Sequence, residues 1–155
     1  MVIIVVCGID AARADVIGEA LVIDGDTLQV ATERIRLHGI DAPEAKQVCG
    51  AGPAAWPCGR MAAEGLVAAI ESQPVRCIGN KRDRYGRLLA VCHAGPVDLN
   101  GAMVRAGWAL AYRRYAKDYV PQEIEARAES RGMWRGSFDA PWNWREAERT
   151  AAVRD

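Results

Sequence analysis

The segment between residues 24 and 44 constrains the fold most, because it contains two short strand patterns and the turns that bound them. Asp24-Gly25-Asp26 is a tight-turn signal, since Gly allows positive φ and Asp bonds to nearby backbone. Residues 27–31 and 34–40 then alternate apolar and polar side chains, which is the periodicity of a strand. Pro43 ends the second pattern because proline cannot donate to a ladder. We therefore expect two adjacent short strands here.

The rest of the chain continues this pattern with short strands and three helices. Further strands are expected at 16–23, 75–82 and 87–93. A helix at 60–71 has one apolar face, and two more helices are expected at 98–105 and 122–131, the second opened by Pro121. Five strands with a helix between the third and fourth predict an α+β fold: a five-stranded OB-fold β-barrel plus three α-helices.

The two ends of the chain of 155 residues are expected to lie outside this single domain. Residues 1–14 resemble a shortened export signal, with an apolar start and a small-x-small cleavage pattern at Ala12-Arg13-Ala14. A buried first strand is the alternative. The domain then spans 15–135, and 136–155 is an irregular tail. The aromatic residues Trp134, Phe138, Trp142 and Trp144 are expected to anchor this tail across the barrel, with ligand binding as the alternative. If residues 1–14 are an export signal, the protein is secreted or periplasmic.

The cysteines agree with export, because removal of the signal leaves an even set of four. If 83–86 form the turn of a hairpin, Arg82 faces Arg87, and counting outward places Cys77 opposite Cys92, close enough for a disulfide. Cys49 then pairs with Cys58 across a loop rich in Gly and Pro. Four reduced, buried cysteines are the alternative.

Charge does not point to a polyanion partner, because 20 basic and 20 acidic residues cancel. No apolar run approaches the roughly 20 residues of a membrane span. Local clusters do suit a nucleic-acid strand, with charge for the backbone and rings for stacking, although such runs alone are more often solvated faces. The first cluster is Lys81, Arg82, Arg84 and Arg87 around Tyr85; the second is Arg113, Arg114 and Lys117 beside Tyr112 and Tyr115.

The opening segment holds three acids and one arginine, and its carboxylates lie at a turn and just past the end of a neighbouring strand, where oxygens from two loops could bind a hard cation. The carboxylates of Asp26 and Asp41 are hard oxygen ligands that suit Ca²⁺. Glu44 follows Asp41 closely and could take a proton from a water beside the cation. Arg36 could bind phosphate bidentately and remains charged at any working pH. Each of these residues alone is as well explained as a turn residue or a surface charge.

Four motifs together resemble the staphylococcal nuclease (thermonuclease) family. They are IDGDTL at 23–28, IRLHGIDAPE at 35–44, DRYGRLLA at 83–90 and VDLNGAMVRAGWALAY at 97–112, followed by RGMW at 131–134. The resemblance implies an OB barrel with three helices that hydrolyses DNA or RNA with Ca²⁺. It implies these roles: Asp26, Asp41 and the Ala42 carbonyl bind the cation; Arg36 and Arg87 bind the scissile phosphate; Glu44 is the general base; Arg84, Tyr85 and Tyr112 line the nucleotide pocket.

The sequence departs from the family pattern in two ways. The chain is neutral where well-known members are basic, and its loop after Glu44 contains Cys49 and Cys58. The leading interpretation is a calcium-dependent endonuclease that works as a monomer, with nucleic acid as substrate, no stable protein partner and no membrane. One alternative is a non-catalytic OB module that binds single strands, and another is a phosphodiesterase for a smaller substrate.

Overall fold

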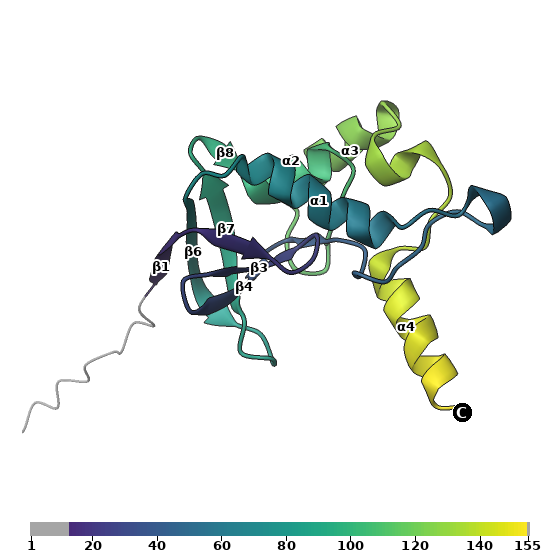
Figure 1. The fold of residues 1–155 in the computed structure, drawn as a ribbon, viewed down its shortest axis with the longest axis horizontal. Coiled ribbons are helices and arrows are strands. Elements are labelled where there is room, and N and C mark those ends of the chain that lie inside the picture. Colours follow the sequence, from purple (N-terminus) through teal and green to yellow (C-terminus); the bar gives the residue numbers. More distant parts are fainter. Residues whose placement is uncertain (1–12, 155) are drawn as a thin grey trace, which may run out of the picture.

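The structure, a computed structural model, describes residues 13–154 and consists of a curled sheet covered by helices (Figure 1). The expected signal segment, 1–14, lies almost wholly outside these residues. The main sheet has the order β1-β6-β7-β4-β3-β2, and β8 pairs with β7. Its strands are β1 (Ala14–Gly18), β2 (Ala20–Val22), β3 (Thr27–Val30), β4 (Glu33–Leu37), β6 (Val75–Arg82), β7 (Leu88–Ala94) and β8 (Val97–Asp98). A separate pair joins β5 (Ile40–Asp41) to β9 (Leu110–Ala111).

The curl of the sheet follows from its connections. The strand expected at 16–23 is broken at Glu19 into β1 and β2, which lie at opposite edges of the sheet. Because only Glu19 separates them in the chain, the two edges must come close together. Strand β4 is parallel to β7, with Ile35 beside Leu88. This pairing joins strands β2, β3 and β4 to strands β1, β6 and β7 in one sheet. The result is the expected OB-like α+β arrangement, as a half-barrel.

The β6–β7 hairpin contains both a wrong and a right prediction. Arg82 faces Leu88 and not Arg87, so the turn is longer than expected. The register shifts between Gly79 and Lys81, and this bulge restores the pairing of Cys77 with Cys92. The structure contains both expected disulfides, Cys77–Cys92 and Cys49–Cys58.

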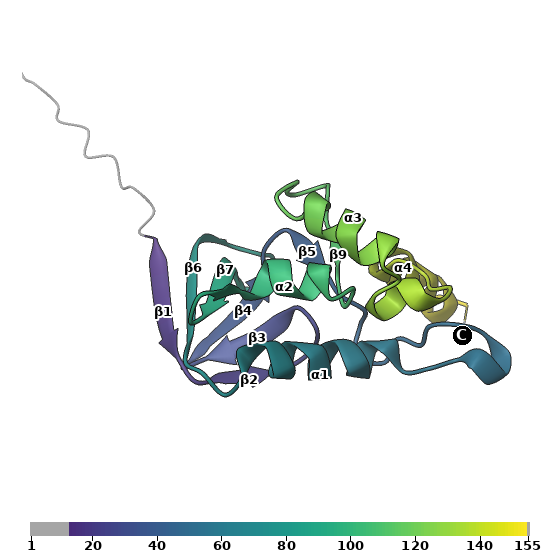
Figure 2. The same ribbon diagram turned by 90° about the horizontal axis from the view of Figure 1, so that it is seen from above.

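The helices cover one face of the curled sheet and bury its apolar side chains. Helices α1 (Cys58–Ile70) and α2 (Leu99–Arg105) lie side by side, and α3 (Val120–Ala128) follows (Figure 2). The short 3-10 turns are η1 (Gly52–Ala54) and η2 (Gly132–Arg135). The buried face of α1 includes Ala62, Leu66 and Ile70, as its periodicity predicts. Asp98 caps α2 by accepting from Gly101 N.

The C-terminal segment was wrongly predicted to be irregular throughout. Residues Pro141–Ala152 form a fourth helix, α4, with proline in its first turn. The expected anchoring role is confirmed for Trp134, Phe138 and Trp142, which pack against a second, smaller core that includes Leu110; Trp144 is not part of that core. The helix was missed because many of its residues are polar or charged, so that its composition resembles that of a loop. Figure 1 shows α4 projecting from the end of the body beside the loop that precedes α1.

Two buried polar side chains hold backbone groups where the main sheet meets the β5–β9 pair. Asn100 of α2 accepts from Cys92 N and donates to the carbonyls of His38 and Ala90. Glu123 of α3 accepts from Ala111 N at 3.0 Å. Both satisfy backbone groups that would otherwise be buried without partners, one set in the main sheet and one in the β5–β9 pair. Among residues 13–154, no helix is long and apolar enough to cross a membrane.

Candidate active site

A buried network of acids and arginines lies where β3, β4 and β5 meet. Arg36 of β4 reaches two carboxylates at once: its Nη1 is paired with Asp26, and its Nη2 lies 2.7 Å from Asp41 Oδ1. Asp26 is 3% exposed and Asp41 is fully buried. One guanidinium therefore holds together two acids that are separated by fifteen positions in the chain.

Backbone contacts fix these acids in place. The turn predicted at residues 24–26 exists, since Asp26 N donates to Asp24 Oδ1 at 3.0 Å. Asp26 Oδ2 accepts from Ala42 N at 2.7 Å, which ties the turn before β3 to the end of β5. Asp26 O also accepts from Leu37 N. The sequence predicted that these loops would converge, and the structure brings Asp26, Arg36, Asp41 and Ala42 together.

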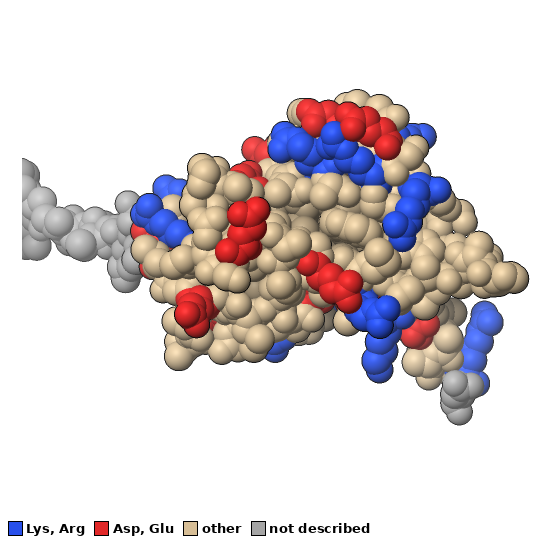
Figure 3. All heavy atoms as spheres, turned by 45° about the horizontal axis from the view of Figure 1, so that its top comes forward, with Lys and Arg blue, Asp and Glu red and all other residues tan. Residues whose placement is uncertain are grey.

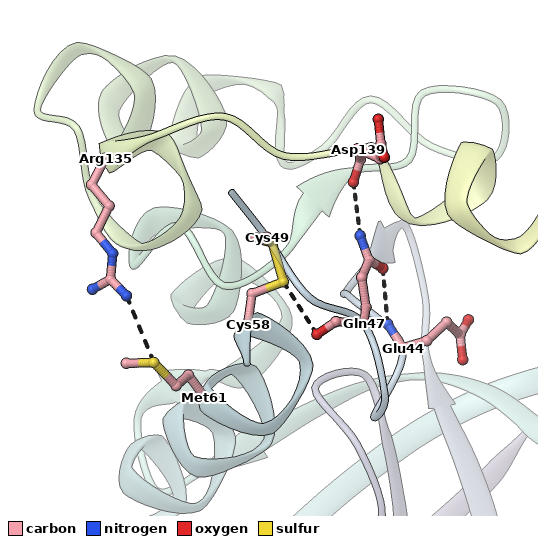
Figure 4. The surroundings of a disulfide bond; sticks show 7 residues. All are labelled: Glu44, Gln47, Cys49, Cys58, Met61, Arg135 and Asp139. Atoms are coloured by element: carbon pink, nitrogen blue, oxygen red, sulfur yellow. Dashed lines mark hydrogen bonds between the residues drawn. A yellow bond between two sulfur atoms is a disulfide. The ribbon is translucent and has the colours of Figure 1, made fainter. Parts of the chain in front are cut away.

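Glu44 lies on the loop after β5, which is braced by Gln47 and a disulfide (Figure 4). Gln47 is 1% exposed; its Oε1 accepts from Glu44 N at 3.2 Å, and its Nε2 donates to Asp139 O at 2.8 Å. The Cys49–Cys58 disulfide closes the same loop onto the start of α1. Gly59 approaches so closely that an added Cβ would lie 1.8 Å from Glu44 O. The loop thus has little room to move.

Sequence reasoning missed Gln47, because a single glutamine in a loop gives no signal of burial. Its contribution depends on Asp139, which lies more than ninety positions further along the chain. Such a contact becomes visible only in the fold.

Arg87 reaches the network from the β6–β7 hairpin through Thr27. Its Nη1 donates to Thr27 Oγ1 at 3.2 Å, and that hydroxyl donates to Asp26 Oδ1 at 3.1 Å. Its Nε lies 2.7 Å from Asp83 Oδ2, so the hairpin turn itself orients the guanidinium. The expected meeting of Arg87 with the Asp26–Arg36 pair is therefore present, with Thr27 as the link.

The network opens onto a cleft of about 920 Å³ that is rich in arginine. Its lining includes Arg36, Arg84, Arg87, Arg113, Arg114, Arg145 and Arg149, together with the rings of Tyr85, Tyr112, Tyr115 and Trp142. Tyr85 is 69% exposed and carries the guanidinium of Arg84 over its ring. By contrast, the face shown in Figure 3 has acidic and basic side chains in mixed groups separated by uncharged areas. The cleft is lined by these seven arginines and by two acids, Asp83 and Glu146, so basic side chains are in excess there although the whole chain is neutral.

Not all of the predicted basic clusters face this cleft. Arg82 is paired with Glu33 at 2.8 Å, and Lys81 lines a smaller hollow on β6. Arg113 does line the cleft, although its Nη2 is also paired with Glu123. The part of the first cluster that reaches the cleft is therefore Arg84, Tyr85 and Arg87.

Helix α4 brings a further arginine, Arg145, into the acid network. Its Nη1 and Nη2 bind Asp41 Oδ1 and Oδ2 at 3.0 and 2.8 Å, and Nη1 also lies 2.8 Å from Glu44 Oε1. One turn earlier on the same helix, Trp142 stacks on Tyr112 with ring centroids 5.4 Å apart and planes 2° apart. A Trp and an Arg at helical spacing after Pro141 was the signal in the sequence, and it was not recognised as such.

Burial and charge act against each other at these acids. Burial would raise the pKa of Asp26, but the charge of Arg36 and the Ala42 N–H outweigh it and hold that pKa below the ordinary value. At Asp41 burial prevails, and the pKa is raised in spite of Arg145 and Arg36. Burial and the neighbouring charge of Asp26 raise the pKa of Asp24 to about 6. Of these three acids, Asp24 and Asp41 therefore bind a proton more readily than a free aspartate does, and Asp26 binds one less readily.

A curled OB-like sheet with buried acids and arginines beside a cationic cleft defines a class of phosphodiester-cleaving proteins. Comparison with known proteins supports the same class. The family model described as staphylococcal nuclease homologue matches residues 34–136. The chain belongs to the staphylococcal nuclease family, and it is a hydrolase of phosphodiester bonds of that family.

Individual relatives cover most of the chain. A protein named micrococcal nuclease from Shigella flexneri is 36% identical over 159 residues, covering 90% of this chain and 86% of that protein. An uncharacterized endonuclease from Escherichia coli is 37% identical over 141 residues, covering 85% and 86%. The succinoglycan biosynthesis protein ExoI from Rhizobium meliloti is 39% identical over 131 residues, covering 81% and 69%. The family match ends at residue 136, before α4 begins.

Proposed function

We propose that this protein is a calcium-dependent endonuclease that hydrolyses the phosphodiester bonds of DNA, RNA or both. One observation carries the proposal: a buried acid–arginine network lies beside an arginine-lined cleft. Glu44 belongs to that network through its contact with Arg145. A non-catalytic module that binds single strands needs the cleft alone. It has no use for buried carboxylates, which cost free energy to fold. Their presence favours an enzyme.

Charge supports a divalent cation in this network. The linked acids Asp24, Asp26, Asp41 and Glu44 carry four negative charges, and Arg36 and Arg145 supply two positive ones. One divalent cation would balance the remaining two negative charges. The donors are hard oxygens, which Ca²⁺ prefers. The chemistry of the donor set therefore fits the metal dependence that is general in this family.

The side chains are arranged here around arginines. Within residues 13–154, no three acidic, histidine or cysteine side chains converge as a metal cluster. Asp41 instead gives both oxygens to Arg145 and one to Arg36. We infer that Asp26, Asp41 and the Ala42 carbonyl would hold Ca²⁺. When bound, the cation supplies Lewis-acid stabilisation of the phosphoryl oxygens.

The other residues take the remaining parts of the reaction. Glu44 is the general base that removes a proton from the attacking water, and the braced loop keeps its carboxylate beside the network. Arg36 and Arg87 donate to the scissile phosphate and neutralise its developing charge. Arg84, Tyr85 and Tyr112 bind the nucleotide next to that phosphate in the cleft.

One assay tests this function directly. Purified protein is incubated with single- and double-stranded DNA and RNA, with Ca²⁺ or with chelator, and the products are separated by length. We expect internal cleavage that requires Ca²⁺. Binding of these substrates without cleavage under any condition would favour the non-catalytic module. Cleavage of a small phosphodiester with no action on polymers would favour the third interpretation.

We also propose that the protein acts outside the cytoplasm. Two disulfides join all four cysteines between residues 13 and 154, and such bonds persist in oxidising compartments. Fractionation of cells that express the full chain, followed by thiol labelling, tests the proposal. We expect the protein in the periplasm or medium with blocked thiols, whereas a cytoplasmic pool with four reactive thiols would contradict it.

A further inference from the structure

We propose that α4 forms an additional wall of the substrate cleft and that Arg145 is a third phosphate-binding guanidinium. The inference rests on the proposed function and extends it to a helix outside the matched family region, which ends at residue 136. It names Arg145 as a substrate-binding residue, with Trp142 as the side chain that positions α4.

The donor groups of Arg145 are only partly used by the protein. Nη1 gives its two N–H groups to Asp41 and Glu44, and Nη2 gives one to Asp41 Oδ2. A guanidinium has five N–H donors, so Nε–H and the second N–H of Nη2 remain. Neither has a partner among the residues that the structure describes. These two donors lie on the same edge of the planar group, and together they form the fork that binds two phosphate oxygens.

The position of Arg145 allows this fork to meet substrate. Arg145 lines the cleft together with Arg36 and Arg87, and its side chain is 28% exposed. The Arg145 side chain therefore lies between the acids Asp41 and Glu44 on one side and the open cleft on the other. Arg149 lies one turn further along α4 and also lines the cleft, so the positive charge continues along the helix.

The rest of α4 is held well enough to present a side chain precisely. Trp142 is stacked on Tyr112, and Trp142 also packs against the smaller core. Just before the helix, Asp139 O accepts from the buried Gln47, which also holds Glu44 N. The loop that carries Glu44 and the helix that carries Arg145 are thus fixed to each other. A helix that served only to cover apolar surface would not need its arginine in the acid network.

Binding without cleavage tests the inference separately from the reaction. Fluorescein-labelled single-stranded DNA and RNA oligonucleotides of one sequence are titrated in chelator, and anisotropy is followed at several salt concentrations. Arg145→Gln is expected to weaken binding about tenfold to a hundredfold, because a charge-assisted contact is lost. The slope of log affinity against log salt should become shallower by about 0.7, the value for one phosphate contact on a single strand.

Two further variants complete the test. Arg145→Lys keeps the charge and loses the fork, so we expect binding about threefold to tenfold weaker with an unchanged salt slope. Arg60→Gln, on an exposed part of α1, is the matched control and should bind as the wild type does. Circular dichroism of each variant reports folding. If Arg145→Gln does not fold, Arg145→Lys decides the question.

Four results would overturn the inference. They are wild-type affinity and slope in Arg145→Gln, weaker binding in Arg145→Gln with an unchanged slope, wild-type affinity in Arg145→Lys, and a wild-type protein that binds neither oligonucleotide. Cleavage is measured in parallel with Ca²⁺. If the wild-type protein cleaves and any of these results is found, the inference fails and the proposed function stands. If the variants lose affinity as expected but the wild-type protein does not cleave, only the proposed enzymatic function is contradicted.

Discussion

Arg145 and Asp41 form a bidentate ion pair across 104 positions of the sequence, with Nη1–Oδ1 and Nη2–Oδ2 distances of 3.0 and 2.8 Å. Asp41 is fully buried, and its other guanidinium partner, Arg36, comes from the sheet. The site is therefore shared between the nuclease domain and a helix beyond it. Residues of this site therefore hold the acids in place, act on substrate, or do both.

Replacing Arg36 should destabilise the protein more than replacing Arg87, although both residues are expected to bind phosphate. Arg36→Ala removes the partner of two buried acids, and we expect a loss of about 3–5 kcal/mol in the free energy of unfolding. Arg87 is more exposed and pairs with Asp83 in the hairpin, so Arg87→Ala should cost less than about 1 kcal/mol. Urea denaturation measures both. Equal losses would show that Arg36 does not hold the acids together.

Replacing Arg87 should lower turnover strongly, although it has little effect on stability. Arg87→Ala is expected to lower kcat by about 10²–10³, since it removes one preorganised donor to the phosphate. The measurement is single-turnover cleavage by protein whose far-ultraviolet circular dichroism matches the wild type. An unchanged kcat would remove Arg87 from its proposed role.

Gly59 should be essential for the position of the Glu44 loop. A Cβ at Gly59 would lie 1.8 Å from Glu44 O, so Gly59→Ala must push the loop away from α1. We expect a stability loss of about 1–3 kcal/mol and lower turnover. Gly136→Ala is the control, because no atom lies within 4 Å of its added Cβ and its φ is −158°. Equal behaviour of the two variants in thermal unfolding and cleavage would contradict this account of the loop.

The two disulfides should differ in their effect on activity. Cys49–Cys58 closes the loop that follows Glu44, whereas Cys77–Cys92 joins two strands that are already paired. Replacing either pair by serine should cost about 2–4 kcal/mol of stability. Only Cys49→Ser with Cys58→Ser should also lower turnover at a temperature where both variants are folded. A comparable loss of turnover in Cys77→Ser with Cys92→Ser would argue against a specific role for the first bridge.

Asp24 should give the apoprotein a stability that depends on pH. Burial, followed by the charge of Asp26, raises the pKa of Asp24 from 3.8 to about 6. The folded protein therefore keeps a proton that the unfolded chain releases above about pH 4. The stabilisation from this proton is complete below about pH 4 and is lost as pH rises through about 6.

Asp24→Asn has no such proton to lose and isolates the effect. Between about pH 4 and 7, the wild type should lose on the order of 1–3 kcal/mol of unfolding free energy more than Asp24→Asn does. Urea denaturation in chelator at several pH values measures the difference. Parallel pH profiles for the two proteins would show that the pKa of Asp24 is not raised.

The sequence allowed prediction of the features that depend on local pattern. Alternation and turn residues identified β3, β4 and β6, and the periodicity of α1 identified its buried face. The disulfide register was predicted correctly, although the turn was one residue too short and a bulge near Asn80 compensated for that error. The break of the first strand at Glu19 was missed, because residues 14–23 are mostly apolar on both sides of it.

Within the site, the residues carried by motifs were predicted and the residues carried by tertiary contacts were not. Asp26, Arg36 and Asp41 come together as expected, since they lie on neighbouring loops and strands. Gln47 has no local pattern that indicates burial, and Arg145 is marked only by its helical spacing from Trp142 after Pro141. The partners of both residues are more than ninety positions away. Arg145 also lies in a helix whose polar composition resembled a loop.

The most direct test of the central claim is single-turnover cleavage by Glu44→Gln. Cleavage of single-stranded DNA and RNA is measured with saturating Ca²⁺, beside the wild type and a chelator control, and oligonucleotide affinity is measured in chelator. If Glu44 is the general base, the variant should bind as the wild type does and cleave about 10²–10⁴-fold more slowly. Cleavage by Glu44→Gln at the wild-type rate would contradict the mechanism proposed for this site.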